Sequence, residues 1–272
     1  MSFCCALADL ERGASRRCFE SPCHAEVNHN ARMTTLLIAT RNNHKVGEIQ
    51  AILGDNYRYL TLKDLPEAPE VVEDRDTFAG NAAKKAEELA AWLGREREKV
   101  RGCLAELAGR LIQRDDGQDT DDGTFTEDGK LLTVADDSGL EVDALGGEPG
   151  VFSARYAAQE SGGEGNSPDG ENNARLLREL GDVPAAEKTA RFRCVIAVVD
   201  VGDLESGAEI FDGACEGRIQ NEASGEGGFG YDPLFVPEGF GQSFAELGEE
   251  TKNKLSHRAC ALEKLKPWLD AR

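Results

Sequence analysis

The sequence predicts an α/β fold, in which strands and helices alternate along the chain. Residues 34–40 form an apolar run rich in β-branched residues, which is typical of a buried strand. Residues 81–93 then carry apolar side chains at a helical spacing, and residues 191–201 alternate before becoming wholly apolar, as a central strand does. This interleaving, without visible internal repeats, favours the α/β class.

The first half of the chain contains two predicted strands and two helical segments. The run 34–40 is the first strand, and residues 46–53 after it form a helical segment. Apolar residues at 82, 86, 89 and 93 predict a helix over 81–93, and the same period continues at Val100, Leu104, Leu107 and Leu111. A second, short apolar strand occupies residues 131–135 and ends at Asp136.

The second half contains a loop, a central strand and a C-terminal helix. Residues 161–170 are rich in Gly, Ser and Pro, which indicates a loop. The strand over 191–201 follows, and the chain closes with an amphipathic helix whose apolar positions are Leu255, Ala259, Leu262, Leu265 and Leu269. We expect this helix to bend or end near Pro267, because proline lacks the backbone N–H that a helix needs.

Two segments differ in composition from the rest of the chain. Residues 1–32 are polar, cysteine-rich and without periodicity, so we predict a disordered leader followed by one domain over 33–272. Met33, one of two methionines, stands where a strand-first domain would begin, which favours it as the translation start. Residues 115–128 hold seven carboxylates and no basic residue, and they predict a solvated, mobile acidic insertion at about 94–130.

Composition and charge limit the classes of partner. The 272 residues are 40% hydrophobic and include no apolar run near the roughly 18 residues of a membrane span, so a cytoplasmic protein without membrane contact is expected. A net charge of -20 repels polyanions and therefore argues against nucleic-acid binding. A small, metal-complexed phosphate ligand stays compatible, because it requires only a locally basic pocket.

The eight cysteines are interpreted as free thiols. Cys194 and Cys260 lie in apolar stretches that indicate buried positions in a core. Half of the cysteines lie in the leader, at Cys4, Cys5, Cys18 and Cys23. Their spacing supplies at best one of the two tight pairs that a zinc site needs, so we do not predict such a site.

A pair of adjacent carboxylates follows the strand over 131–135. Asp136 and Asp137 precede Ser138 and Gly139, so we expect the chain to turn here, at a strand end where open α/β sheets bind ligands. Adjacent carboxylates point in different directions, so that one binds a metal while the other orients or deprotonates water. Alone, the pattern is more common as a simple turn held by local hydrogen bonds.

A polar turn with a lysine follows the first strand and precedes a helix. It consists of Thr40, Arg41, Asn42, Asn43, His44 and Lys45. Free backbone N–H groups at the helix start and the ammonium of Lys45 form an arrangement that binds phosphate. The turn lacks the glycines of a Walker loop, so by itself it is also compatible with a solvated connection.

Two further segments offer groups for a ligand. Residues 225–233 place four glycines around two aromatic rings, which permits close backbone approach and ring stacking; a hairpin turn with packed aromatics is the alternative. Lys252, His257 and Arg258 offer cations to phosphate or to the polar edge of a base, or else form a solvated helix end. Nothing indicates a nucleophile elbow, and only four histidines are present.

The order of these motifs is more specific than any one of them. The chain reads Thr-x-Asn-x-x-Lys, Asp-Asp-Ser-Gly-Leu, Pro-Gly-x-x-Ser-Ala-Arg-Tyr, Gly-Gly-Phe-Gly-Tyr-Asp-Pro and Lys-x-x-x-Ser-His-Arg. From about Met33 to Leu269 it resembles the inosine triphosphate pyrophosphatase family, the Ham1-like dITP/XTP pyrophosphatases. The resemblance implies Mg²⁺-dependent hydrolysis of ITP, dITP or XTP to the monophosphate and pyrophosphate. It also implies a homodimer and an elongated mixed sheet flanked by helices, with the active cleft between two lobes.

The resemblance also implies roles for individual residues. Asp137 matches the metal-linked general base, Asp136 is its acidic neighbour, and Glu73 is the second metal carboxylate, with Glu67 or Glu70 as substitutes. The remaining matches are substrate contacts. They are Thr40, Asn42 and Lys45 for the triphosphate, Ser138 as a further substrate contact, Phe229, Gly230, Tyr231 and Asp232 beside the base, and Lys252, His257 and Arg258 for the purine and phosphate.

The chain departs from the family pattern at a few places. Gly80 replaces a glutamate usual in Phe-x-Glu-Asn-Ala, which removes a carboxylate near the expected metal, and Arg41 stands where many members have glycine. The leader and the insertion over 94–130 are expected to lie outside the pattern. Two alternatives follow, a pyrophosphatase of different base preference and a nucleotide-binding regulator whose turnover is weakened by Gly80.

Overall fold

The computed structural model describes residues 33–96, 102, 130–160, 162–163 and 165–272, which belong to one compact unit spanning residues 32–272. The predicted leader, the helical continuation over 100–111 apart from its residue 102, and the acidic stretch 115–128 lie outside these residues. No helix in the described part is long and apolar enough to cross a membrane.

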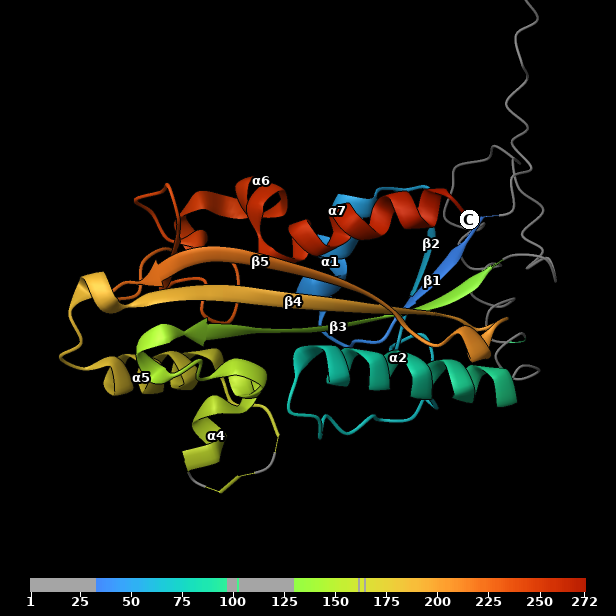
Figure 1. The fold of residues 1–272 in the computed structure, drawn as a ribbon, viewed down its shortest axis with the longest axis horizontal. Coiled ribbons are helices and arrows are strands. Elements are labelled where there is room, and N and C mark those ends of the chain that lie inside the picture. The colour runs from blue at the N-terminus through green and yellow to red at the C-terminus, as the bar shows by residue number, and fades with distance from the viewer. Residues whose placement is uncertain (1–32, 97–101, 103–129, 161, 164) are drawn as a thin grey trace, which may run out of the picture. The chain divides into compact units, whose positions relative to one another are not determined.

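A single mixed sheet of six strands forms the centre of this unit (Figure 1). The strands are β1 (Thr35–Ile38), β2 (Arg58–Thr61), β3 (Leu131–Val142), β4 (Thr189–Asp200), β5 (Glu209–Ile219) and β6 (Phe235–Pro237). Their order is β2-β1-β3-β4-β5-β6, with β1 parallel to both of its neighbours and all later pairs antiparallel. The long strands β3 and β4 make the sheet elongated, as expected for the resembled family.

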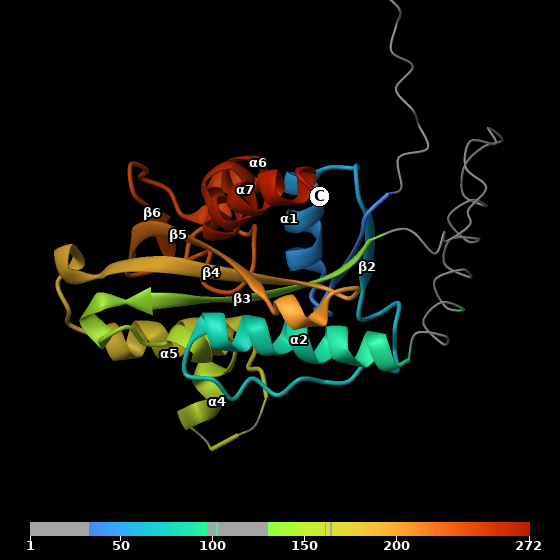
Figure 2. The ribbon, with the colours of Figure 1, turned by 45° about the vertical axis from the view of Figure 1, so that its right-hand side comes forward.

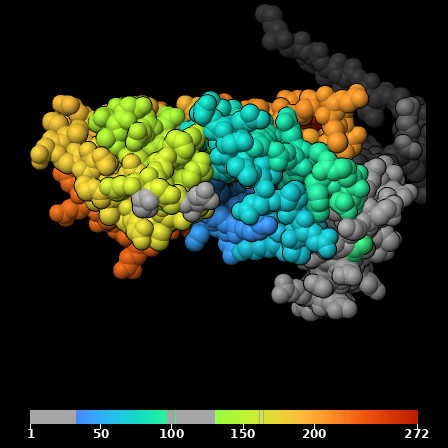
Figure 3. Space-filling view, turned by 90° about the horizontal axis from the view of Figure 1, so that it is seen from below, coloured from blue at the N-terminus to red at the C-terminus, as the bar shows by residue number. Residues whose placement is uncertain are grey.

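Helices cover both faces of the sheet (Figures 1 and 2). On one face lie α1 (Asn43–Leu53), α6 (Phe244–Leu255) and α7 (His257–Asp270), and on the other lie α2 (Phe78–Arg95) and α5 (Asp169–Leu180), with the short α4 (Tyr156–Glu160) beside it. Figure 3 shows the second face, where the α2 segment and the α4 and α5 segments lie side by side. The apolar stripes of these helices pack on the sheet and form its core.

Most predicted elements are confirmed, with shifted ends. β1, α1, α2, β4 and α7 coincide with the predicted segments, and the Ser- and Gly-rich connection leads into α5 at Asp169. The last helix was expected to bend or end near Pro267, and α7 contains Pro267 and ends three residues beyond it, at Asp270. The strands β2, β5 and β6 and the helices α4, α5 and α6 were not predicted. In α5 the buried residues Asn172, Leu176 and Leu180 do recur at a helical spacing, a signal that the sequence interpretation did not use.

The predicted turn at Asp136 is also wrong. β3 runs straight through both aspartates to Val142, because β4 pairs with it continuously from Leu132↔Asp200 to Val142↔Ala190. Gly139 serves close packing here rather than a turn. A Cβ atom at Gly139 would lie 2.4 Å from the carbonyl oxygen of Gly150, so only glycine fits this part of the strand.

Candidate active site

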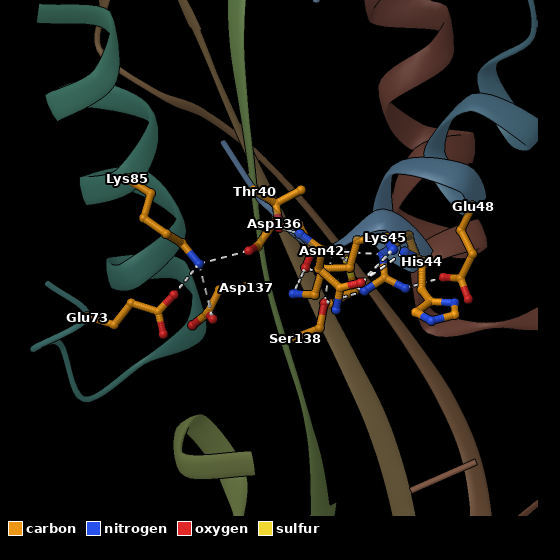
Figure 4. Close-up of polar contacts among 12 residues, drawn as sticks. Thr40, Asn42, His44, Lys45, Glu48, Glu73, Lys85, Asp136, Asp137 and Ser138 are labelled. Atoms are coloured by element: carbon orange, nitrogen blue, oxygen red, sulfur yellow. Dashed lines mark hydrogen bonds and ion pairs between the residues drawn. The ribbon is translucent and has the colours of Figure 1, made fainter. Parts of the chain in front are cut away.

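The site lies where β1 stops pairing with β3. The last pair is Ile38↔Val134, and beyond this point β3 pairs with β4 on one side, while its other side has no strand neighbour until the isolated bridge Glu141↔Pro149. The chain leaving β1 enters the turn 40–45 and then α1, so that turn lies beside the part of β3 that has lost its β1 partner. Because alternate residues of a strand face opposite sides, Asp136 and Asp137 point to opposite faces of the sheet (Figure 4).

Asp136 is the buried counterion of two cations on the α1 and α7 face. Its carboxylate accepts from Arg258 Nε at 2.9 Å and Ser138 Oγ at 2.9 Å, and it also forms an ion pair with Lys45. Burial acts to raise the pKa of Asp136, but Arg258 and then Lys45 outweigh this effect and hold it well below its ordinary value. Asp136 is therefore an anion whose oxygens are already engaged.

Asp137 lies on the α2 face, beside a second buried cation. Lys85 Nζ donates to Glu73 Oε1 at 2.7 Å and to the Asp136 carbonyl at 2.8 Å, and lies 3.4 Å from Asp137 Oδ1 (Figure 4). Burial raises the pKa of Asp137 although Lys85 opposes it, while the pKa of Glu73, which burial alone would raise, is lowered by Lys85. Arg155 also contacts Glu73, at 3.5 Å.

The Asp137 side of the site suits a hard divalent cation. Asp137 Oδ2 is buried and makes no hydrogen bond of ordinary geometry to a described residue. Within the described residues no three His, Cys, Asp or Glu side chains form a ready metal cage. Mg²⁺ commonly takes only one or two carboxylates and completes its shell with water and phosphate oxygens. Asp137 offers an open oxygen to such an ion. Glu73 contacts Lys85 at 2.7 Å and Arg155 at 3.5 Å, so it would bind the ion by exchanging one of these contacts, of which the longer one to Arg155 is the weaker.

A cavity of about 220 Å³ opens on the other side of β3, lined among others by Lys45, Ser138, Phe229, Lys252 and His257. A locally basic pocket was expected within the acidic chain, and Lys45, Lys252 and Arg258 provide it. Each of these cations is paired with a carboxylate in this structure. Phosphate oxygens entering the cavity would therefore compete with those carboxylates for the same donors.

The loop 225–233 forms one wall of the cavity. Asp232 Oδ2 accepts from Phe229 N at 2.8 Å and from Lys252 Nζ at 2.6 Å, and the Lys252 ammonium lies 4.3 Å from the centre of the Phe229 ring. Tyr231 is buried and donates to the carbonyl of Ser153 at 2.9 Å, so its hydroxyl group holds the wall together. The segment belongs to the long loop that connects the antiparallel strands β5 and β6, so the two aromatic residues lie in a hairpin connection that also lines the cavity.

His257 and Arg258 begin α7 and are both buried. The His257 ring stacks on Phe192 with centroids 4.8 Å apart, and its Nδ1 has no hydrogen-bond partner among the described residues. Burial, together with the charges of Arg258 and Lys252, lowers the pKa of His257 well below its ordinary value. The imidazole is therefore neutral, with one nitrogen a donor and the other an acceptor, and His257 is among the residues that line the cavity.

The turn 40–45 is held by its own side chains. Asn42 caps α1, since its Oδ1 accepts from the backbone N–H groups of His44 at 2.9 Å and Lys45 at 3.5 Å, and Thr40 Oγ1 accepts from Asn42 N at 3.1 Å. Asn43 and Arg41 are exposed, and Asn43 accepts from Lys63. The turn thus aims Lys45 at Asp136.

Known proteins resemble this chain over most of its length. A model of the Ham1 family matches residues 36–114 and 121–268. The chain belongs to the Ham1 family. This match includes residues 94–114 and 121–130, which we expected to lie outside the family pattern, so that expectation is wrong for all but residues 115–120 of the segment.

Relatives of similar length support the Ham1 assignment. A dITP/XTP pyrophosphatase of Shouchella clausii is 42% identical over 238 residues, covering 88% of this chain and 98% of its own. A dITP/XTP pyrophosphatase of Geobacter sulfurreducens is also 42% identical, with coverage of 87% and 97%. The Staphylococcus aureus Ham1 protein has a similar structure, with a TM-score of 0.64 at 30% identity and coverage of 88% and 99%. A nucleoside-triphosphatase / dITP/XTP pyrophosphatase from Mycobacterium abscessus has a TM-score of 0.58 at 34% identity, with coverage of 86% and 100%.

Sequence reasoning missed several charged residues of this candidate site, among them Lys85 and Glu48. Lys85 lies on the apolar stripe of α2, between Ala82 and Leu89, and a lysine in such a stripe is a signal of a buried, paired cation. Glu48 follows Lys45 by one turn and contacts both Arg258 and Lys252, the latter at 2.8 Å.

Gly80, the departure noted in the sequence, lies in the first turn of α2. Its N–H donates to Thr77 Oγ1 at 3.0 Å, and a Cβ atom there would lie 2.9 Å from the Cβ of Arg75. A larger residue would therefore require Arg75 to move. The effect of Gly80 on metal binding stays a prediction.

Proposed function

We propose that this chain hydrolyses the non-canonical purine nucleoside triphosphates dITP, ITP and XTP to the monophosphate and pyrophosphate. The observation that carries the proposal is that two features suited to a nucleoside triphosphate and its metal lie on opposite faces of the same strand. A cation-lined cavity lies on one face of β3, and a buried carboxylate with an unpartnered oxygen lies on the other. The names of the Ham1 relatives support the same substrate class.

Asp137 is proposed as the general base that takes a proton from the attacking water. Its Oδ2 is free to accept that proton, and its raised pKa brings the carboxylate closer to the pH at which bases work efficiently. Lys85 holds the other carboxylate oxygen and thereby fixes the direction in which Oδ2 points. The expected product of attack between the α and β phosphates is pyrophosphate.

Asp137 and Glu73 would hold Mg²⁺, with water and phosphate oxygens completing its shell. When bound, this ion neutralises phosphate charge and lowers the pKa of water. Asp136 was also predicted as a metal ligand. Since Lys45 and Arg258 occupy its oxygens, we assign it instead the role of orienting these cations toward the triphosphate.

Base selection is proposed to depend on donors at the far end of the cavity. Hypoxanthine, xanthine and guanine carry a 6-oxo group where adenine carries an amine, so donors to this oxygen select against ATP, while selection against GTP would depend on the 2-amino group of guanine. Arg258, which is fully buried and stays protonated, and the neutral His257 can donate to that oxygen. A buried donor left unpaired by adenine costs about 1 to 3 kcal/mol.

A panel of triphosphates tests the proposal. The protein is incubated with Mg²⁺ and ITP, dITP, XTP, ATP or GTP, and the released phosphate species is identified. Pyrophosphate from the first three, with little from ATP or GTP, is expected, and this activity should be lost in Asp137→Asn but kept in the exposed control Asp143→Asn. Orthophosphate release, turnover confined to another base, or binding without turnover would contradict the proposal.

We further propose that the protein acts in the cytoplasm as a homodimer. The acidic charge and the expected substrate pool support the first point, and the family resemblance supports the second. Sedimentation of the purified chain measures the second directly, and a mass equal to one 29.4 kDa chain would contradict it.

A further inference from the structure

Two aromatic rings from distant segments stack at the mouth of the cavity. His44 lies in the first turn of α1, and Phe229 lies in the loop 225–233. Their ring centroids are 5.4 Å apart and their planes differ by only 22°. Phe229 lines the cavity, as do Asn42 and Lys45 on either side of His44, so the pair lies at the edge of the substrate space.

Each ring belongs to a segment whose backbone is held by its own hydrogen bonds. The backbone N–H of His44 donates to Asn42 Oδ1 at 2.9 Å, which fixes the first turn of α1. Phe229 N donates to Asp232 Oδ2 at 2.8 Å, and the next N–H, of Gly230, donates to Asp169 Oδ2 at 2.7 Å. Because these anchors are independent of the ring contact, the two rings can separate without either losing its support.

The family resemblance already implies that Phe229 lies beside the base. We propose that His44 supplies the second ring of a clamp that takes the purine base between the two rings, so that His44 contacts the base and not the phosphates. This inference rests on the proposed function. Stacked bases lie about 3.4 Å apart, so a base between two rings requires about 7 Å. From the present 5.4 Å the segments therefore separate by about 1.5 Å on binding, a movement of ordinary size for loops.

The clamp differs in role from the donors inside the cavity. Every base presents a π-face, so stacking adds affinity with little regard to the group at position 6. Arg258 and His257, which reach the edge of the base, would decide between a 6-oxo group and an amine. Removing His44 should therefore weaken binding of all purine triphosphates alike and leave the preference of ITP over ATP unchanged.

Kinetics of His44→Ala test the clamp. Loss of one stacking partner is expected to raise the KM for ITP by about 5- to 30-fold, with kcat within twofold of the wild type. His44→Phe, which keeps an aromatic ring, should return the KM to within about threefold. Gln50→Ala, an exposed change on the same helix, is the matched control and should leave both constants unchanged.

Inorganic tripolyphosphate distinguishes a contact with the base from a contact with the phosphates. It carries the phosphate chain without a base, so its inhibition constant should be the same for wild type and His44→Ala. Equal weakening of ITP and tripolyphosphate, or an unchanged or lowered KM for ITP, would overturn the clamp while the pyrophosphatase activity stands. A wild-type protein that does not hydrolyse ITP would overturn the proposed function, and the clamp with it.

Discussion

The buried charge cluster around Asp136 gives the strongest prediction for stability. Asp136→Asn keeps the shape of the side chain but removes its charge. Arg258, whose side chain is 0% exposed, then keeps only Glu48 as a carboxylate partner. The amide NH₂ group that replaces one carboxylate oxygen is itself a donor, so it cannot accept a hydrogen bond from Arg258 or Lys45. Lys45 is 19% exposed and can recover part of its hydration, so most of the loss comes from Arg258.

The expected cost is near the lower end of the range for a broken buried ion pair, about 3 kcal/mol. For a domain of this size that loss lowers the thermal midpoint by about 6 to 12 °C. The control is Asp143→Asn, which removes the same charge from an exposed pair with Arg191 and should cost under about 1 kcal/mol. Because both variants reduce the net negative charge equally, general repulsion cancels in the comparison.

Urea unfolding at pH 7, followed by the fluorescence of Trp92 and Trp268, measures the difference. The slope of the unfolding free energy against urea should stay the same, and the midpoint should fall far more in Asp136→Asn than in Asp143→Asn. Equal losses in the two variants would show that the desolvation of Asp136 cancels its attraction to the cations, and the counterion role would be wrong.

Three further outcomes are expected. Asp137→Asn should abolish turnover yet raise the unfolding free energy at pH 7 by about 1 kcal/mol, because the fold raises the pKa of Asp137 and so disfavours its charged form; a destabilised variant would contradict this. The unfolded chain protonates His257 near pH 6.5 and the folded chain does not, so stability should fall below pH 6.5 by up to about 1.4 kcal/mol per pH unit; a His257→Gln variant with the same pH slope would disprove it. Gly139→Ala should cost about 1 to 3 kcal/mol, because its Cβ would lie 2.4 Å from the Gly150 oxygen. Gly47→Ala, with nothing within 4 Å in an exposed helix, should stabilise by about 1 kcal/mol, and thermal unfolding of the two variants compares them.

The sequence alone predicted the α/β class and most of the segments that carry the site. β1 and β4 were visible because they are buried and β-branched, and α2 because its apolar residues recur at a helical period. The order of five short motifs indicated the family, since such an order is far more specific than any single motif. These are local signals, and local patterns are what a sequence displays directly.

Only the tertiary structure decided how those residues are connected. The strand through Asp136 and Asp137 continues because β4 pairs with it, and β4 lies more than 50 residues further along the chain. Lys85 joins the site because α2 packs on the strand that carries Asp137, and hence a residue that could belong to a solvated helix face becomes a buried partner. Such long-range packing leaves no periodic trace in the sequence, which is why the motifs were found while the buried ion pairs that hold them were not.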